Sequence, residues 1–197
     1  MKNLHQHILY NKKEILPDIN SKIGYDYVIC GNRIILRGEN PFFKTHINLQ
    51  SINIRGLDSV DIISPVIELK YGKIPDILLK KIIDLVKGDN EQFFQIYFDM
   101  GKKEYALFVP EQKGDPEAVT YSSSQRNVVA EFHTHPNMKA FFSDIDDRDE
   151  LGFKIYGVLG TKKGRVEEII IRVGVYGYFQ YIYMKDCFEE VTECCGL

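Results

Sequence analysis

Long apolar runs, an excess of basic residues and a cysteine framework are all missing from this sequence of 197 residues. Arg172 interrupts the most apolar segment of the second half, so no run approaches the roughly 20 residues that a membrane-spanning helix needs. The N-terminus also lacks the apolar segment of a signal peptide. With 25 basic against 28 acidic residues and a formal charge of -3, the chain offers no basic surface for nucleic acid. We therefore expect neither a membrane nor a nucleic acid as a partner.

The four cysteines are spaced unlike metal ligands. They are Cys30, Cys187, Cys194 and Cys195, and an adjacent pair rarely forms a disulfide with itself. This usage predicts a protein of a reducing, cytoplasmic compartment. The apolar content of 44% and the aromatic content of 12% suffice for the core of a folded domain.

The first part of the chain predicts a small β-rich extension. Residues 1 to about 22 are polar and mixed, which favours a short helix or an irregular arm. Two apolar runs, 25–30 and 33–37, flank Gly31-Asn32, a pair typical of a two-residue β-hairpin turn. Residues 46–55 alternate as a further strand. The expected organisation is an extension over 1–60, a main domain over 61–186 and a tail over 187–197.

The sequence of the main domain predicts mostly strands and few helices. A helix is expected over 76–86, where apolar residues recur at helical spacing, and a second, acidic helix from Ser143 to about residue 151. Residues 110–124 are expected to form a loop. Strands are predicted at 65–70, 91–98, 104–109, 127–135, 153–159, 168–173, 175–178 and 181–183. This order predicts an α/β or α+β fold, a sheet covered by few helices.

The chemistry gathers around the stretch Glu-Phe-His-Thr-His-Pro at residues 131–136, which holds the only two histidines of the second half. In a strand, His133 and His135 point to the same face. Ser143 is typical of a helix N-cap, and Asp146 follows within the first turn. Two imidazoles and one carboxylate make a three-ligand zinc site with a position left for water, whose pKa the metal lowers towards about 7. Ser143 is then placed to donate to an oxyanion.

Hydrolysis of an amide also needs a base outside the ligand set. Glu91, which opens the strand after the first helix, is our choice. Glu131 shares a face with both histidines but lies about 6–7 Å along the strand from His133, which suits a residue that orients an imidazole. Glu104 and Glu111 are further rivals. The choice between Glu91 and Glu131 stays open.

Each half of this pattern also has a simpler structural interpretation. His-x-His alone often means nothing, and Ser-x-x-Asp alone is more often a capping box than a catalytic device; their combination is far rarer. A calcium loop is excluded because its sixth position is Asp149 rather than Gly and its twelfth is Ile155 rather than Glu. A phosphoesterase or amidohydrolase barrel also begins with His-x-His, but it needs further histidines downstream, and none follows His135. The chain is also too short for an eight-stranded barrel. Lys139, Phe141 and Phe142, just before Ser143, indicate either a lid over the metal or a substrate groove, with core packing of the two aromatics as the alternative.

His133-Thr134-His135-Pro136, followed by six residues and Ser143-Asp144-Ile145-Asp146, resembles the motif of the JAMM (MPN+, JAB) metallopeptidases. The resemblance implies a cytidine-deaminase-like α/β sandwich over about 62–185, and zinc-dependent cleavage of isopeptide or peptide bonds after ubiquitin or ubiquitin-like tails. It further implies zinc ligands at His133, His135 and Asp146, an oxyanion role for Ser143, and Glu91 as the acid–base.

A narrower resemblance rests on three stretches: Tyr25-Asp26-Tyr27-Val28, Val109-Pro110-Glu111-Gln112, and Ala140-Phe141-Phe142-Ser143 running into 147–157. They are similar to the PRTRC system protein A family, JAB-containing bacterial proteins whose gene clusters also encode an E1-like and a ubiquitin-like component. The implied partners are a ubiquitin-like protein as substrate and possibly an E1-like protein. Two alternatives stay open: a non-catalytic MPN-fold binding module for such a partner, and a metallopeptidase for small peptides. The presence of all three ligands favours an enzyme.

Overall fold

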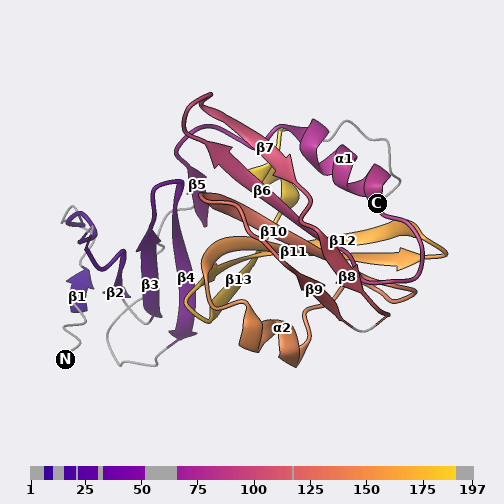
Figure 1. Ribbon diagram of the computed structural model, residues 1–197. Coiled ribbons are helices and arrows are strands. Elements are labelled where there is room, and N and C mark those ends of the chain that lie inside the picture. The colour runs from indigo at the N-terminus through magenta and orange to yellow at the C-terminus, as the bar shows by residue number, and fades with distance from the viewer. Residues whose placement is uncertain are drawn as a thin grey trace. The chain divides into compact units, whose positions relative to one another are not determined.

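The computed structural model describes residues 7–10, 16–20, 22–30, 33–51, 66–116 and 118–189. The chain divides into two compact units, Met1–Tyr71 and Gly72–Leu197, and each is built on a β-sheet of its own (Figure 1). The boundary expected near residue 60 lies outside the described residues. Within the described ranges, no helix combines the length and the apolar character needed to cross a membrane.

The first unit is a five-stranded sheet in the order β1-β2-β3-β4-β5. Its strands are β1 (His7–Tyr10), β2 (Tyr25–Cys30), β3 (Arg33–Glu39), β4 (Phe43–Ser51) and β5 (Ile67–Leu69). The antiparallel pairing of β2 with β3 confirms the expected hairpin. The expectation of a helix or an irregular arm before residue 22 was wrong at β1, because β1 is defined by parallel pairing with β2, a long-range contact that its own residues do not predict. Strand β4 begins three residues before the expected start.

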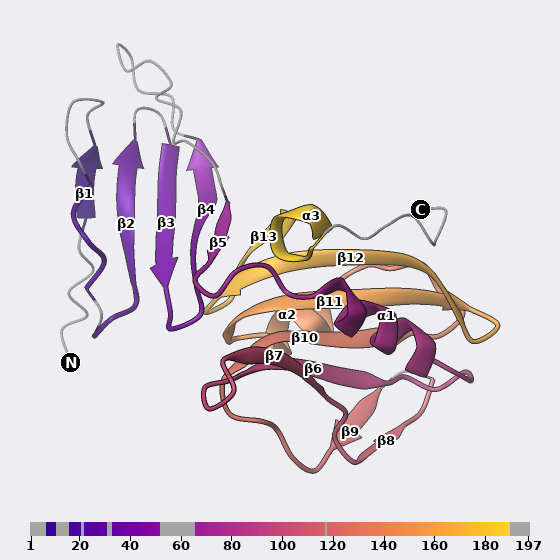
Figure 2. The same ribbon diagram turned by 90° about the horizontal axis from the view of Figure 1, so that it is seen from above.

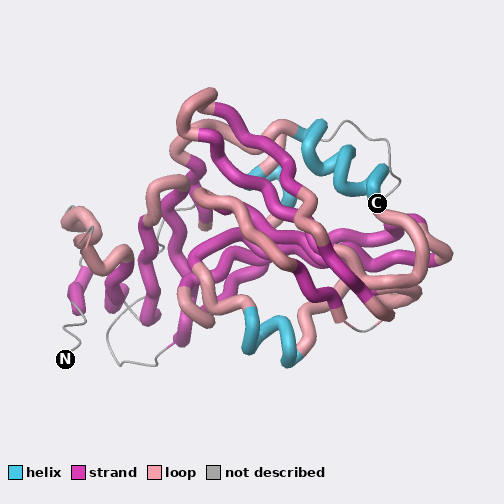
Figure 3. The backbone as a smooth tube through the Cα atoms, in the orientation of Figure 1, coloured by secondary structure: helices cyan, strands magenta, loops and turns pink. Residues whose placement is uncertain are grey.

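The second unit is a mixed six-stranded sheet in the order β13-β12-β11-β10-β6-β7. The central neighbours β10 and β11 are parallel, and the other pairs are antiparallel. The strands are β6 (Phe93–Asp99), β7 (Glu104–Phe108), β10 (Val128–His135), β11 (Phe153–Lys162), β12 (Arg165–Val175) and β13 (Tyr178–Ile182). Strands dominate the second unit, with short helices beside them (Figure 3). The expected α/β class with few helices is confirmed.

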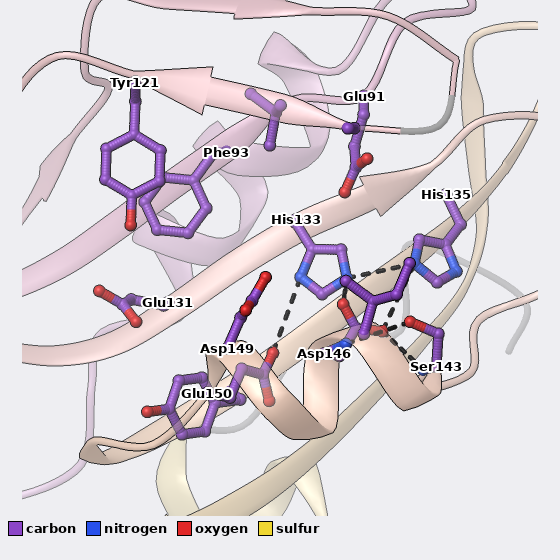
Figure 4. Close-up of a pocket in the computed structure, with 14 residues that line it drawn as sticks. Glu91, Phe93, Tyr121, Glu131, His133, His135, Ser143, Asp146, Asp149 and Glu150 are labelled. Atoms are coloured by element: carbon purple, nitrogen blue, oxygen red, sulfur yellow. Dashed lines mark hydrogen bonds and ion pairs between the residues drawn. The ribbon is translucent and has the colours of Figure 1, made fainter.

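The two faces of this sheet differ in character. Helix α1 (Asp76–Leu85) and helix α2 (Asp144–Asp149) lie on opposite faces (Figures 1 and 2). Helix α1 buries Leu78, Leu79 and Ile82, whereas α2 buries no residue. Neighbouring residues of β10 follow the same division: Phe132 packs against Phe188, with ring centroids 6.2 Å apart, and His133 faces α2 (Figure 4). The face under α2 is therefore the one that carries polar chemistry.

Three local expectations for this unit were wrong. The loop expected over 110–124 contains a two-stranded sheet, β8 (Gln112–Gly114) and β9 (Val119–Tyr121). The strand expected over 175–178 is interrupted by a turn, because Tyr176 and Gly177 have φ of 50° and 89°. The tail expected from residue 187 begins inside the fold: α3 (Met184–Cys187) ends in a buried cysteine, and Phe188 is fully buried. Phe188 is placed by a distant segment, because it forms an isolated β-bridge with Ile74.

Candidate metal centre

The two histidines end the strand β10, which lies between β6 and β11 in the sheet. Both are buried and face the same side, as strand alternation requires. Thr134, on the other face, accepts a hydrogen bond from the backbone N–H of Gln92 at 2.9 Å, and its own N–H donates to the Gln92 carbonyl at 2.9 Å. This pairing ties the end of β10 to the residue next to Glu91.

The Nε2 atoms of His133 and His135 lie 3.2 Å apart. Asp146 Oδ1 lies 3.2 Å from His133 Nε2, and Asp146 Oδ2 lies 3.9 Å from His135 Nε2. Around a tetrahedral ion with ligand distances of about 2.0–2.1 Å, neighbouring ligand atoms are separated by about 3.3 Å. Two of the three pairs therefore have the spacing of adjacent ligands, and the third, between His135 and Asp146, is wider at 3.9 Å. The chemistry of this donor set fits a tetrahedral metal ion.

The capping of α2 orients the aspartate. Ser143 is the N-cap, and its Oγ accepts from the Asp146 backbone N–H at 3.2 Å. In return, Asp146 Oδ2 accepts from the Ser143 backbone N–H at 2.6 Å. This reciprocal pair is a capping box, so the expected N-cap is confirmed. Because Oδ2 is engaged by the cap, Oδ1 is the oxygen turned to His133.

Glu91 approaches from the side opposite α2 (Figure 4). It precedes β6 by two residues, and its backbone N–H donates to the Asp115 carbonyl at 2.8 Å. A carboxylate oxygen of Glu91 and one nitrogen of each histidine lie within 4.8 Å of one another. Burial raises the pKa of Glu91, although the His133 charge opposes this. Its position suits either a proton acceptor or a metal ligand.

A glycine fixes the approach of the hairpin to Glu91. A Cβ added to Gly114 of β8 would lie 2.0 Å from the Glu91 carbonyl oxygen, closer than any real side chain comes. Only glycine allows β8 to pass at this distance. The β8–β9 hairpin, which the sequence did not indicate, therefore determines the backbone position of Glu91.

The rival glutamates lie elsewhere or are engaged. Glu131 Oε1 accepts from Lys154 Nζ at 2.7 Å and from Gln95 Nε2 at 3.0 Å. Among the described residues that line the pocket are Glu91 and Glu131, but not Glu104 or Glu111. Glu131 lines the pocket with its carboxylate already held by an ion pair.

Glu150 is a site residue that sequence reasoning missed. Its Oε1 lies 3.9 Å from His133 Nδ1, and with His133 and Asp146 it forms a second group of potential ligands. Burial raises the pKa of Glu150 to about 7, against the opposing effect of Arg172. One signal was available: Glu150 follows Asp146 by four residues, which places both on one helix face.

The histidines differ in their electrostatics. Burial, helped by the nearby His133 charge, lowers the pKa of His135 to about 4, so its imidazole is neutral and can coordinate a cation. Burial also opposes protonation of His133, but the hydrogen bond and charge of Asp146, with Glu150 and Glu91, outweigh it and raise the pKa of His133. Burial likewise opposes ionisation of Asp146, yet His133 and Ser143 hold the pKa of Asp146 well below its usual range. Asp146 is therefore an anionic donor.

The two phenylalanines before Ser143 have separate roles. The Phe141 ring packs edge-on to His135 with centroids 4.6 Å apart and remains 44% exposed. His135 Nδ1 is buried and lacks a hydrogen-bond partner in the described part of the chain. The Phe142 ring instead lies over the guanidinium of Arg172, with 3.8 Å between the ring centroid and the Arg172 Cζ atom. Phe141 thus covers one side of a histidine, and the half-buried Phe142 packs against Arg172.

A cavity of about 230 Å³ adjoins these residues. Beyond the histidines and carboxylates, it is lined by Phe93, Val119, Tyr121, Ile145 and Tyr156, among others. The rings of Phe93 and Tyr121 stack in parallel, with centroids 4.3 Å apart. The candidate ligands therefore open onto a partly apolar pocket rather than onto a flat surface.

A mixed sheet that presents two histidines and several carboxylates to one pocket defines an α/β domain with a candidate metal centre. Residues 81–171 match the family described as prokaryotic homologs of the JAB domain, a range that includes Glu91, both histidines, Ser143 and Asp146. This part of the chain is therefore similar to the JAB/MPN family. A search of curated proteins found no match to the chain.

Proposed function

We propose that this protein is a cytoplasmic zinc metallopeptidase of the JAMM type, which cleaves peptide or isopeptide bonds at the C-terminal tail of a ubiquitin-like modifier. The observation that carries the proposal is the spacing of 3.2 Å from His133 Nε2 to both His135 Nε2 and Asp146 Oδ1. The family match supports a hydrolase of this type. The substrate class follows from the motif resemblance, which also makes an E1-like protein a second proposed partner.

In this proposal His133, His135 and Asp146 hold the ion. A zinc ion in that position would lower the pKa of a water molecule towards about 7 and polarise the scissile carbonyl. Glu91 takes the proton of the attacking water and passes it to the leaving nitrogen. The burial that raises the pKa of Glu91 favours holding that proton between the two steps.

Ser143 and the cavity complete the proposed reaction. Ser143 Oγ accepts from the Asp146 N–H and keeps its own hydrogen available to donate to the oxyanion. The cavity of about 230 Å³ is smaller than typical pockets of about 300–1,000 Å³ for small molecules. Its size suits a short stretch of extended chain, such as a modifier's tail, better than a folded domain.

Metal analysis tests the first half of the proposal. The purified wild-type protein is expected to hold about one zinc ion per chain, and His135→Ala is expected to lose it. His46→Ala serves as the matched control, because His46 lies in the first compact unit, and it should keep the metal. A wild-type protein that binds no zinc after reconstitution would refute the proposed function.

A cleavage assay tests the second half. The substrate is a ubiquitin-like protein joined through its C-terminal tail to a reporter, compared with the isolated tail peptide. The wild type is expected to release the modifier, and His135→Ala is expected to be inactive. Zinc binding and modifier binding without release would instead indicate the non-catalytic binding module. Cleavage of the free peptide alone would indicate a peptidase for small substrates.

A further inference from the structure

Helix α2 carries a proposed metal ligand, yet nothing apolar attaches it to the sheet. It spans six residues, Asp144–Asp149, and buries none of them. Its single apolar side chain, Ile145, is 63% exposed. Helices this short are not stable by themselves in water. Polar contacts must therefore hold Asp146 beside the histidines.

Those contacts converge on Arg172, a charged residue of β12 that is only 3% exposed. Its Nη1 donates to Asp147 Oδ1 at 2.5 Å. Its Nε and Nη2 donate to Glu150 Oε2 at 3.0 and 2.6 Å. Asp147 directly follows the proposed ligand, and Glu150 is the C-cap of α2. A single guanidinium thus binds two carboxylates of the helical turn that directly follows Asp146.

Aromatic rings enclose the same guanidinium. Phe142 lies 3.8 Å from the Arg172 Cζ atom and Phe179 lies 3.6 Å from it, measured to the ring centroids. Phe142 immediately precedes the N-cap Ser143, and Phe179 belongs to β13. The rings exclude water, which strengthens charge-assisted hydrogen bonds and cation–π contacts. Arg172 therefore connects the loop before α2, the helix itself and the sheet.

We propose that Arg172 is a positioning residue: it fixes α2 on the sheet so that Asp146 faces the histidines, and it holds Glu150 beside His133. Arg172 lies one residue beyond the range that matches the family model. The effect on the metal rests on the proposed function, whereas the effect on α2 does not. Arg172 touches none of the reacting groups and acts only through its partners.

Hydrogen exchange on the metal-free protein tests the effect on α2. Arg172→Met keeps a chain of similar length but removes the ion pairs, and Arg148→Met makes the same change at an exposed arginine of α2. We expect exchange within residues 143–151 to become at least tenfold faster in Arg172→Met, with β10 and β11 still protected. Arg148→Met should match the wild type. Unchanged protection of 143–151 in Arg172→Met would overturn the proposal.

A second variant covers the case in which Arg172→Met does not fold. Asp147→Asn removes one carboxylate partner whose side chain is 52% exposed and leaves Arg172 and Glu150 paired. It is expected to fold and to accelerate exchange in residues 143–151 by a smaller factor than Arg172→Met. Arg172→Lys keeps the charge but not the two-pronged donor geometry, so it should restore part of the protection. Wild-type exchange in Asp147→Asn, with Arg172→Met unfolded, would count against the positioning role.

Zinc affinity, measured by competition with a chelating dye, tests the consequence for the metal. Loss of a residue that orients metal ligands typically weakens binding by about 10–100-fold, and we expect this range for Arg172→Met. A loosened α2 with unchanged zinc affinity would overturn the positioning role. A wild-type protein without zinc would refute the proposed function, and the exchange experiment would still decide whether Arg172 holds α2.

Discussion

Replacement of Glu91 by glutamine tests whether Glu91 is a general base or a metal ligand. The change preserves the size of the side chain and removes its ability to accept a proton. A carboxylate oxygen of Glu91 lies within 4.8 Å of one nitrogen of each histidine. Asp146 Oδ1 lies closer, 3.2 Å from His133 Nε2, which is the spacing of adjacent ligands. We therefore expect Glu91→Gln to keep zinc and to lose turnover.

The magnitude follows from the role assigned to Glu91. General acid–base catalysis contributes about 10²–10⁴-fold, which corresponds to about 2.7–5.4 kcal/mol at about 1.36 kcal/mol per tenfold change in rate. The loss should fall on kcat, because the proton is transferred in the chemical step. The zinc affinity of the variant should stay within about threefold of the wild type, since no ligand is removed.

The assay is steady-state cleavage of the modifier fusion, with zinc titration of each variant. Glu131→Gln is the matched control: Glu131 lines the same pocket, but its carboxylate pairs with Lys154 at 2.7 Å. The control should retain most of the turnover. If Glu91→Gln stays active while Glu131→Gln is inactive, Glu91 is the wrong base. If Glu91→Gln loses zinc while Asp146→Asn retains it, Glu91 is a ligand and the assignment of Asp146 is wrong.

Three further outcomes are expected. Gly114→Ala, whose Cβ would lie 2.0 Å from the Glu91 carbonyl oxygen, should displace Glu91 and lower kcat at least tenfold with zinc retained; unchanged kcat would show that the hairpin does not position Glu91. Ser143→Ala should lower the free energy of unfolding, measured by denaturation, by about 1 kcal/mol because the helix cap is lost. It should also lower kcat, measured by steady-state kinetics, by about 10²–10³-fold because the oxyanion donor is lost. Zinc at 100 times its Kd should stabilise the wild type by about 2.7 kcal/mol, which raises its Tm by about 5–10 °C. Scanning fluorimetry measures this shift, and the Tm of His135→Ala should not change.

Local relationships along the chain were predictable, because they depend on geometry within one element. The alternation of a strand puts His133 and His135 on one face, and the spacing of Ser143 and Asp146 defines a capping box, as the structure confirms. The α/β class followed in the same way from the periodicity of successive segments. The motif that carries the family resemblance lies entirely within this local information.

The tertiary structure alone decided which distant residues complete the site. Strand β1 is defined by pairing with β2, twenty residues further along the chain. The β8–β9 hairpin pairs locally, but only the fold brings its Gly114 against the Glu91 carbonyl. Arg172 reads in the sequence as an interruption of an apolar strand, yet it lies buried between two rings and binds the helix that carries Asp146. A buried charge must be paired wherever the fold supplies partners, and only the packing of α2 on the sheet determines which partners those are.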